Sequence, residues 1–316
     1  MQDNWNNQKV ALMNLNSPLY SGGGSPMAFS VFHSAFAIYG SIDYLGTGNN
    51  LLRMFVYSAS PQERDFTEEE LTDGTFTTWA GSSASYARIN KLYNQLGDSD
   101  LDLSTPVSNN NLFYNPTNNE IRVDQAGYYQ YTSLFTLASG AGQKVSNAFG
   151  DNTTSSDTTF VLGARKKGSS MYELPASGRT MFTLRDTTTP NYATFAKHKA
   201  VHVKSASLTD DIGISARGND NQQVSFHHDT FATSLKTHIF EIERIPASSV
   251  TVTDMNYFLD GTQVIDEQTT NLDNDISLGR IEIGDNRYVF KGAMLFNKIL
   301  TADEKSAVHT RMSEDY

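Results

Sequence analysis

The alternation of hydrophobic and polar positions predicts a chain made mostly of short β-strands. In the segment LLRMFVYS, the apolar residues Leu52, Met54 and Val56 alternate with a second set of side chains, as in a strand with one buried face. Similar segments recur between clusters of Gly, Asn and Asp: EIRVDQ, TTFVLGAR, RTMFTLRD, AVHVKSAS, DIGISARG, KTHIFEIERI and RYVFKGAMLFN. Helical segments that would connect parallel strands are missing from the pattern, so we expect two packed antiparallel sheets.

The first 26 residues differ in composition from the rest of the chain. Residues 1–26 are rich in Asn and end in a Gly-Gly-Gly stretch followed by Pro26, which indicates a flexible joint. We therefore expect an N-terminal arm, residues 1–26, and one domain, residues 27–316. The apolar segment VALMNL in the arm packs either on its own domain or on a neighbouring chain, and the sequence leaves both open. The candidate partner-docking residues are Val10, Leu12, Met13 and Leu15.

Charge and cysteine content narrow the classes of partner. The 316 residues include 24 Lys and Arg against 35 Asp and Glu, a formal net charge of −11. This balance disfavours nucleic acid and anionic membranes as partners. The chain has no cysteine, which excludes disulfides and thiolate metal sites. The N-terminus lacks the features of a signal peptide, and no stretch approaches the roughly 20 apolar residues of a membrane span. We therefore expect synthesis in a cytoplasm and no membrane insertion.

Three local motifs near the end of the chain have a direct structural meaning. Asp260-Gly261 lies between two strand-like segments and suits the positive φ angles of a tight hairpin turn. Gly292, within YVFKGAMLF, indicates a point where the strand bends or is closely approached. Thr301 and Glu304 form the spacing of a capping box, which predicts a helix from this point onward.

These motifs occur in order within YFLDGTQVIDEQTTNLDNDISLGRIEIGDNRYVFKGAMLFNKILTADEK. The segment resembles the C-terminal half of a concanavalin A-like, laminin-G-type jelly roll. The resemblance implies an all-β, concanavalin A-like jelly-roll β-sandwich with a short N-terminal arm and a short C-terminal helix. It bears on the fold and says almost nothing about function.

A second resemblance involves the pieces LLRMFVYSASPQERDF, FTTWAG and KLYNQLGD. They resemble a segment found in uncharacterised bacteriophage proteins and, more distantly, in the catalytic domain of arabinofuranosidases. The motif W-Y-D-Q-S-G-N of those enzymes is altered here, because Asn94 replaces the Asp and Leu96-Gly97 replaces Ser-Gly. The departures weaken the enzymatic reading of the resemblance.

A glycosidase needs two carboxyl groups about 5 Å apart for retention or about 6.5–9.5 Å apart for inversion. The arabinofuranosidase resemblance implies that Asp285, in Gly284-Asp285-Asn286, matches the general acid of those enzymes, whereas their nucleophile has no counterpart. Glu173, Asp186 and Glu243 are candidates for a second carboxylate, and the sequence does not choose among them. Asp in such a turn is more often a turn former, so we expect no catalytic residue and keep Asp285 as the minority candidate.

Metal sites are not favoured by the sequence. His198 and His202 share an H-x3-H spacing, but on a strand they stand about 13 Å apart, and His227-His228 are adjacent. The acidic segment NLDNDIS, residues 271–277, lacks the Gly and the final Glu of an EF-hand loop. We expect no cofactor, with Ca²⁺ at this segment as the alternative.

The candidate ligand-binding residues are aromatic or belong to the Gly-Asp-Asn turn: Tyr128, Tyr129, Tyr131, Asp285 and Asn286. The resemblance to phage proteins, the lack of a signal peptide and the docking-type arm lead to one functional expectation. The protein is a non-enzymatic bacteriophage virion component, in capsid decoration or at the tail, made in the bacterial host cytoplasm. Its partners are other virion proteins, a cell-surface glycan for host attachment, or further copies of itself as a homo-oligomer. The alternatives are a glycoside hydrolase of the arabinofuranosidase type and a carbohydrate-binding module.

Overall fold

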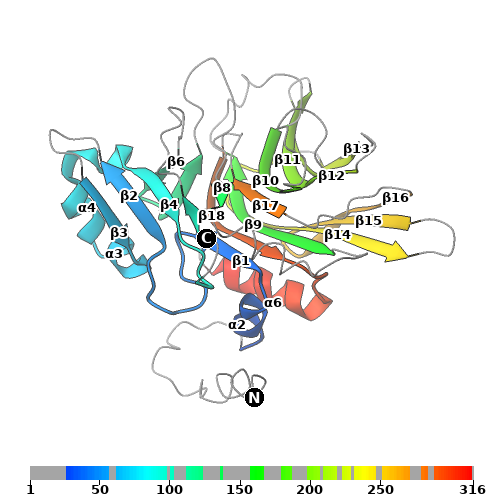
Figure 1. The fold of residues 1–316 in the computed structure, drawn as a ribbon, viewed down its shortest axis with the longest axis horizontal. Coiled ribbons are helices and arrows are strands. Elements are labelled where there is room, and N and C mark those ends of the chain that lie inside the picture. Colours follow the sequence, from blue (N-terminus) through cyan, green and yellow to red (C-terminus); the bar gives the residue numbers. More distant parts are fainter. Residues whose placement is uncertain are drawn as a thin grey trace.

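The fold is an all-β sandwich of the jelly-roll type (Figure 1). The computed structural model describes residues 26–56, 62–97, 100–102, 112–123, 136–137, 157–166, 179–186, 198–206, 209–218, 223–228, 231–246, 251–270, 279–283 and 288–314. Within these residues every strand pairing is antiparallel. The predicted all-β sandwich is therefore confirmed.

The larger sheet contains 13 of the described strands. Its continuous path runs β16-β15-β14-β9-β18-β7-β6-β4-β2-β3, while β1 pairs with β18, and β5 pairs with β4 and with β8. The strands are β1 (Ala37–Gly40), β2 (Leu52–Val56), β3 (Gln62–Phe66), β4 (Arg88–Leu92), β5 (Leu101–Asp102), β6 (Leu112–Asn115), β7 (Glu120–Val123), β8 (Thr136–Leu137), β9 (Thr158–Lys166), β14 (Lys236–Pro246), β15 (Thr251–Leu259), β16 (Thr262–Thr270) and β18 (Tyr288–Phe296).

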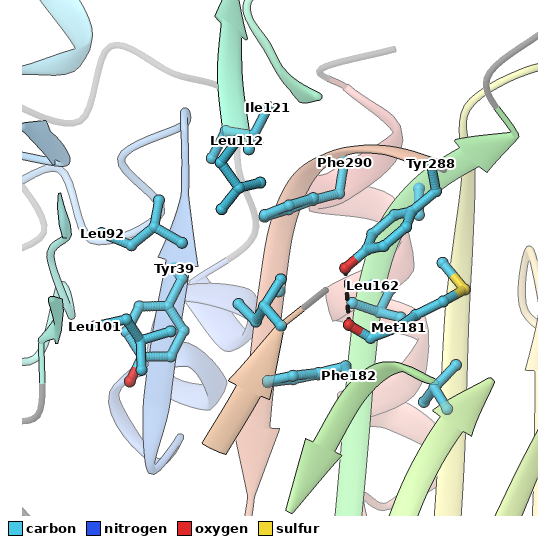
Figure 2. Close-up of a cluster of buried hydrophobic side chains, with 14 of the residues drawn as sticks. Tyr39, Leu92, Leu101, Leu112, Ile121, Leu162, Met181, Phe182, Tyr288 and Phe290 are labelled. Atoms are coloured by element: carbon cyan, nitrogen blue, oxygen red, sulfur yellow. Dashed lines mark hydrogen bonds between the residues drawn. The ribbon is translucent and has the colours of Figure 1, made fainter. Parts of the chain in front are cut away.

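The smaller sheet has five described strands in the order β13-β12-β11-β10-β17. They are β10 (Arg179–Asp186), β11 (His198–Ala206), β12 (Thr209–Arg217), β13 (Gln223–His228) and β17 (Gly279–Ile283). The sheet packs over one part of the larger sheet, and buried aromatic rings meet between them. Phe160 of β9 contacts Phe182 of β10 edge to face, with ring centroids 5.3 Å apart. Figure 2 shows this interior, in which Phe290 and Tyr288 of β18 also lie.

Helices cover those parts of the core face of the larger sheet that the smaller sheet leaves uncovered. The short helices α3 (Glu68–Thr72) and α4 (Thr75–Ala80), with the 3-10 turn η1 (Gly81–Tyr86), pack on the core face of β2, β3 and β4. There the Phe76 ring lies 5.4 Å from that of Phe66 and 5.0 Å from that of Tyr114. These contacts extend the core that begins between the two sheets.

The opposite side of the larger sheet carries a second core. Helices α2 (Pro26–His33) and α6 (Ala302–Ser313) cover β1, β9, β14 and β18 on this side (Figure 1). The apolar segment MAFSVFHSAFAIYG contains the end of a helix and a whole strand, because α2 is followed closely by β1. The buried residues of this second core are Val31, Phe32, Ile38, Ile42, Tyr44, Leu45, Val161, Ile239, Met294, Phe296, Leu300, Ala307, Val308 and Met312.

The local motifs identified in the sequence occur as predicted. Asp260 and Gly261 have φ values of 47° and 81° and form the turn between β15 and β16. Thr301 and Glu304 make the capping box that starts α6. Thr67 caps α3 in the same way.

Gly292 occupies a crowded position, as its sequence context indicated. It lies opposite Gly40 of β1 and Gly163 of β9, next to a register shift in β18. A Cβ atom at this position would lie 2.5 Å from the Tyr44 hydroxyl oxygen and 2.7 Å from its ring. A glycine is therefore needed here so that the ring of Tyr44 can lie against the strand.

Other predictions lie outside the described residues. They include residues 1–25 of the arm, so the division into arm and domain stays a prediction. Within the described part of the chain, no helix has the length and apolar character needed to cross a membrane.

Candidate functional site

The face of β2, β4, β6 and β7 that points away from the core carries an unusual set of side chains. Met54 of β2 and Ile121 of β7 point into the core, so their chain neighbours occupy the opposite face. We call this surface the outer face. On it lie Phe55, Arg88, Phe113 and Arg122, one from each strand, and all four are half-buried.

The strand register places these side chains in one line. Phe55 lies opposite Arg88, Arg88 opposite Phe113, and Phe113 opposite Arg122. The line continues through Val289 of β18 to Arg165 of β9. Directly opposed residues of antiparallel strands share a face and lie about 5 Å apart, so the side chains form a continuous row across the sheet. We call Phe55, Arg88, Phe113, Arg122 and Arg165 the Arg–Phe row.

Over its first four members, Phe55, Arg88, Phe113 and Arg122, the Arg–Phe row alternates aromatic rings with guanidinium groups at a regular interval. Because neighbouring strands are about 4.8 Å apart, Arg88 and Arg122 lie about 10 Å from each other, and so do Phe55 and Phe113. The Arg122 Cζ atom lies 5.2 Å from the centre of the Phe113 ring, which is within cation–π range. The row therefore places aromatic rings and guanidinium groups in turn across these four strands.

One end of the Arg–Phe row is fixed by an internal carboxylate. Arg165 donates from Nε and Nη2 to the two oxygens of Glu120, at 2.9 and 2.8 Å. Glu120 lies on β7 and is buried, and its hydrogen bond raises the pKa of Arg165. This fork-to-fork pair shows how a carboxylate fits a guanidinium of the row.

The other end of the outer face carries a polar cluster. Arg53 of β2 donates from Nε and Nη2 to Asp65 of β3, at 2.6 and 3.1 Å, and also from Nη2 to the Tyr93 hydroxyl at 2.8 Å. The Tyr93 hydroxyl donates to Asp65 at 2.8 Å. The hydrogen bond from Arg53 lowers the pKa of Asp65. Lys91 lies 5.3 Å from the centre of the Tyr93 ring. This cluster adds a third aromatic ring and two more cations beside the Arg–Phe row.

The piece that resembles the arabinofuranosidase motif has a structural role. The Asn94 side-chain oxygen accepts a hydrogen bond of 2.9 Å from the Ile38 backbone of β1. Gln95 accepts from the Tyr44 backbone at 2.9 Å and donates to the Ile42 carbonyl at 2.6 Å. Both side chains are buried, so these contacts hold the segment around β1 in place.

The structure pairs one of the candidate carboxylates with a neighbour. Glu243 of β14 lies directly opposite Asp254 of β15. Burial raises the pKa of Glu243, and the charges of Asp157 and Asp254 raise it further. Asp186 is the last residue of β10, in the other sheet. Sequence analysis proposed Glu243 but missed Asp254, because only strand register brings the two together.

The histidines that the sequence singled out lie on strands of the smaller sheet. His198 and His202 belong to β11, and His227 and His228 belong to β13. In the part of the chain that the structure describes, no group of three or more His, Asp or Glu side chains is arranged to hold a metal ion.

The remaining candidates lie outside the described residues, and their roles stay predictions. They are Asp285, Asn286, Tyr128, Tyr129, Tyr131, Val10, Leu12, Met13, Leu15, Glu173 and the acidic segment 271–277.

Comparisons with known proteins add no assignment. No family model matches the chain, and no curated protein matches it. Among solved structures, the receptor-binding domain of botulinum neurotoxin type G is 11% identical over 83% of this chain and 51% of that one, with a TM-score of 0.40. A botulinum neurotoxin type C structure, described with two ganglioside molecules, is 14% identical over 65% and 45%, with a TM-score of 0.41. A Trypanosoma rangeli sialidase is 12% identical over 84% and 33%, with a TM-score of 0.40. The chain thus matches about half or less of each of these three structures, and the likenesses identify no function.

Proposed function

We propose that this protein is a non-enzymatic, glycan-binding domain and that the outer face is its binding surface. The observation that carries the proposal is the alternation of Phe and Arg in the Arg–Phe row across β2, β4, β6 and β7. Sugar rings present one apolar face and many hydroxyl groups. A row in which aromatic rings and guanidinium groups alternate has a group of the right kind for each of these features.

The wider role that we propose is the one expected from the sequence: a bacteriophage virion component that attaches to host-surface glycan. The support for this part is the resemblance of LLRMFVYSASPQERDF and its neighbouring pieces to phage proteins. An antibody against the protein should label purified phage particles, and the protein should co-sediment with these particles. Particles that lack the protein by mass spectrometry would contradict the virion placement and leave the glycan-binding proposal intact.

The binding surface is tested by a glycan array followed by calorimetry with the best ligand. Phe113→Ala and Arg122→Gln should each weaken binding about tenfold, because each removes one stacking or charged contact. Arg311→Gln is the control, since Arg311 lies on α6 and on none of the four strands that form the outer face. If both row variants bind like the wild type, the outer face is not the binding surface.

A hydrolase is the second candidate, and the pairing of Glu243 with Asp254 favours it. Their side chains start about 5 Å apart, near the separation used by retaining glycosidases. The ligand found on the array should be incubated with the protein and assayed for new reducing ends. Cleavage that Glu243→Gln abolishes would overturn the non-enzymatic proposal.

A further inference from the structure

A buried histidine lies in the interior at one end of the sandwich. His238 of β14 is 1% exposed, and its ring lies among those of Phe231, Phe240 and Tyr257, with centroids 5.5, 6.3 and 6.0 Å away. We propose that the contact between His238 and Tyr257 is acid-sensitive: it keeps β13 of the smaller sheet on the larger sheet, and protonation of His238 releases this strand. The inference concerns a conformational change and does not depend on the proposed glycan surface.

Two hydrogen bonds fix the position of the hydrogen on the neutral ring. Nε2 lies 3.2 Å from the Ala164 carbonyl oxygen of β9, and Nδ1 lies 2.8 Å from the Tyr257 hydroxyl oxygen of β15. A carbonyl oxygen can only accept, so Nε2 carries the hydrogen and donates it. Nδ1 therefore carries the lone pair and accepts from the Tyr257 hydroxyl. The neutral ring of His238 thus links three neighbouring strands of the larger sheet.

A second proton on the ring is incompatible with this arrangement. It would bind to Nδ1, where the new N–H would face the hydrogen of the Tyr257 hydroxyl. The hydroxyl would have to turn and accept instead, yet Tyr257 is 0% exposed and has no second hydrogen-bond partner among the residues that the structure describes. The protonated ring would therefore combine a buried charge with an unsatisfied donor. Burial accordingly lowers the pKa of His238 to about 4.

The nearest charged side chains do not neutralise a positive ring. Asp260, in the turn after β15, raises the pKa of His238, whereas Lys236, two positions before the histidine on β14, lowers it. Lys236 Nζ and Asp260 Oδ2 form an ion pair of 2.5 Å with each other. The carboxylate is therefore already engaged by a cation, and it cannot serve the ring as a dedicated counter-ion.

The other elements packed around the ring supply no counter-charge. Lys166, a cation, lies on β9 two positions after the residue whose carbonyl accepts from Nε2, and so on the same side of that strand. His228 of β13 meets Tyr257 edge to face, with ring centroids 6.0 Å apart. On β16 the residue opposite Tyr257 is the uncharged Ile265. Among these described neighbours of the ring, Asp260 is the only carboxylate.

The strand that lies over this contact is one that can separate at low cost. Residues 224–228 of β13 are all half-buried, and within the described chain β13 pairs only with β12. The strand lies against β16 at one end of the larger sheet (Figure 1). The chain that follows it places Phe231 on the His238 ring. Elements with few buried contacts open at the lowest free energy, so a proton on His238 should favour separation of β13 and Phe231, which lets water reach the ring.

The direction of the pH dependence follows from the protons bound in each state. In the open state His238 lies in water and binds a proton near pH 6.5, as an ordinary histidine does. In the closed state its pKa is about 4. Between these values the open state binds more protons, so acid favours opening. The ratio of open to closed molecules should rise on the order of a hundredfold from pH 6.5 to pH 4 and stay level above pH 7.

The test is hydrogen exchange of the full chain, read by mass spectrometry from pH 4 to pH 8 and corrected for the intrinsic pH dependence of amide exchange. Peptides that cover β13 and residues 231–240 should lose protection toward acid, whereas peptides that cover β2 and β4 should keep it. His238→Gln should make the exchange of the first set independent of pH. His33, an exposed histidine on α2, supplies the matched control, because His33→Gln should respond to acid as the wild type does.

Two further measurements decide the matter if His238→Gln does not fold. NMR of the wild-type ring nitrogens should show the hydrogen on Nε2 and a titration near pH 4. Tyr257→Phe removes the donor to Nδ1, so the neutral ring loses a partner and its pKa should move back toward that of an ordinary histidine. The opening of this variant should therefore depend less steeply on pH than that of the wild type.

Three results would overturn the inference. The first is a hydrogen on Nδ1, or titration of the folded-state His238 ring near pH 6.5. The second is loss of protection by all peptides in step, because this would be unfolding of the whole domain rather than release of β13. The third is an acid response that persists in His238→Gln and disappears in His228→Gln, which would make His228 the group that responds to acid.

Discussion

The Tyr288 hydroxyl donates a 2.7 Å hydrogen bond to the Met181 carbonyl and so joins β18 of the larger sheet to β10 of the smaller one (Figure 2). Both residues are fully buried. Tyr288→Phe would leave that carbonyl without this donor in a dry interior. We expect a loss of about 1–3 kcal/mol in the free energy of unfolding, measured by urea denaturation.

A matched control for this prediction is Tyr93→Phe. Its hydroxyl also forms hydrogen bonds, since it donates to Asp65 and accepts from Arg53, but Tyr93 is only half-buried, so water can replace the contacts. The control should lower the free energy of unfolding clearly less than Tyr288→Phe does. Equal losses of stability in the two variants would mean that the hydrogen bond between the sheets stabilises the fold no more than a partly exposed one does.

The close approach at Gly292 gives a second prediction. Gly292→Ala should destabilise the fold by about 1–3 kcal/mol, because the new methyl group would collide with the ring of Tyr44. Unfolding of Tyr44→Ala and of the double variant completes the cycle. The glycine substitution should cost little once the ring is gone. A cost that persists in the double variant would place the strain elsewhere in β18.

The sequence predicted those features that depend on neighbours along the chain. The turn at Asp260-Gly261 and the cap at Thr301 follow from local chemistry, and both are present. The strand β2 follows from the alternation of Leu52, Met54 and Val56, which are buried as predicted. Local rules therefore gave the class of fold and much of its detail.

The Arg–Phe row could not be predicted from the sequence, because it depends on the order of the strands in the sheet. Phe55 and Arg122 are 67 positions apart by residue number, and only the path β2-β4-β6-β7 aligns them. The alternation in β2 predicts that Phe55 lies opposite the core, but it does not predict what stands beside it. Register between distant strands is set by packing of the whole sheet, and a shift of one residue would scatter the row.

The contact between Lys305 and Glu241 gives a third prediction. Lys305 of α6 donates to both oxygens of the Glu241 carboxylate, at 3.1 and 2.9 Å, and Glu241 is buried beneath the helix on β14. Lys305→Met would leave a buried carboxylate without its cation, at a cost of about 3–5 kcal/mol near neutral pH.

The pH dependence distinguishes this loss from a packing defect. Burial already raises the pKa of Glu241, and Lys305 opposes that rise. Without the lysine the folded-state pKa should rise further, so the unfolded state releases the proton first as pH increases. The variant should then lose stability as pH rises from about 5 to about 7, measured by urea midpoints. A loss that stays constant over this window would point to lost packing against Phe258, whose ring centre lies 4.1 Å from Nζ.

Lys199 gives the last prediction, which concerns a buried amine between the two sheets. It lies on β11, is 1% exposed and donates to the Thr158 hydroxyl of β9 at 3.1 Å. Burial lowers its pKa to about 7, with the Asp157 charge opposing this shift and the Arg244 charge adding to it. In the unfolded chain the pKa is about 10.4. Between these values the unfolded state binds a proton that the folded state has released, so the free energy of unfolding should rise with pH from about 7 to about 10 and be flat below.

Lys199→Met should remove this slope and stabilise the protein near neutral pH. The control Lys298→Met, at the surface beside Glu304, should retain the slope. Urea midpoints across this range decide the matter, and an unchanged slope in Lys199→Met would show that Lys199 is not the group that titrates.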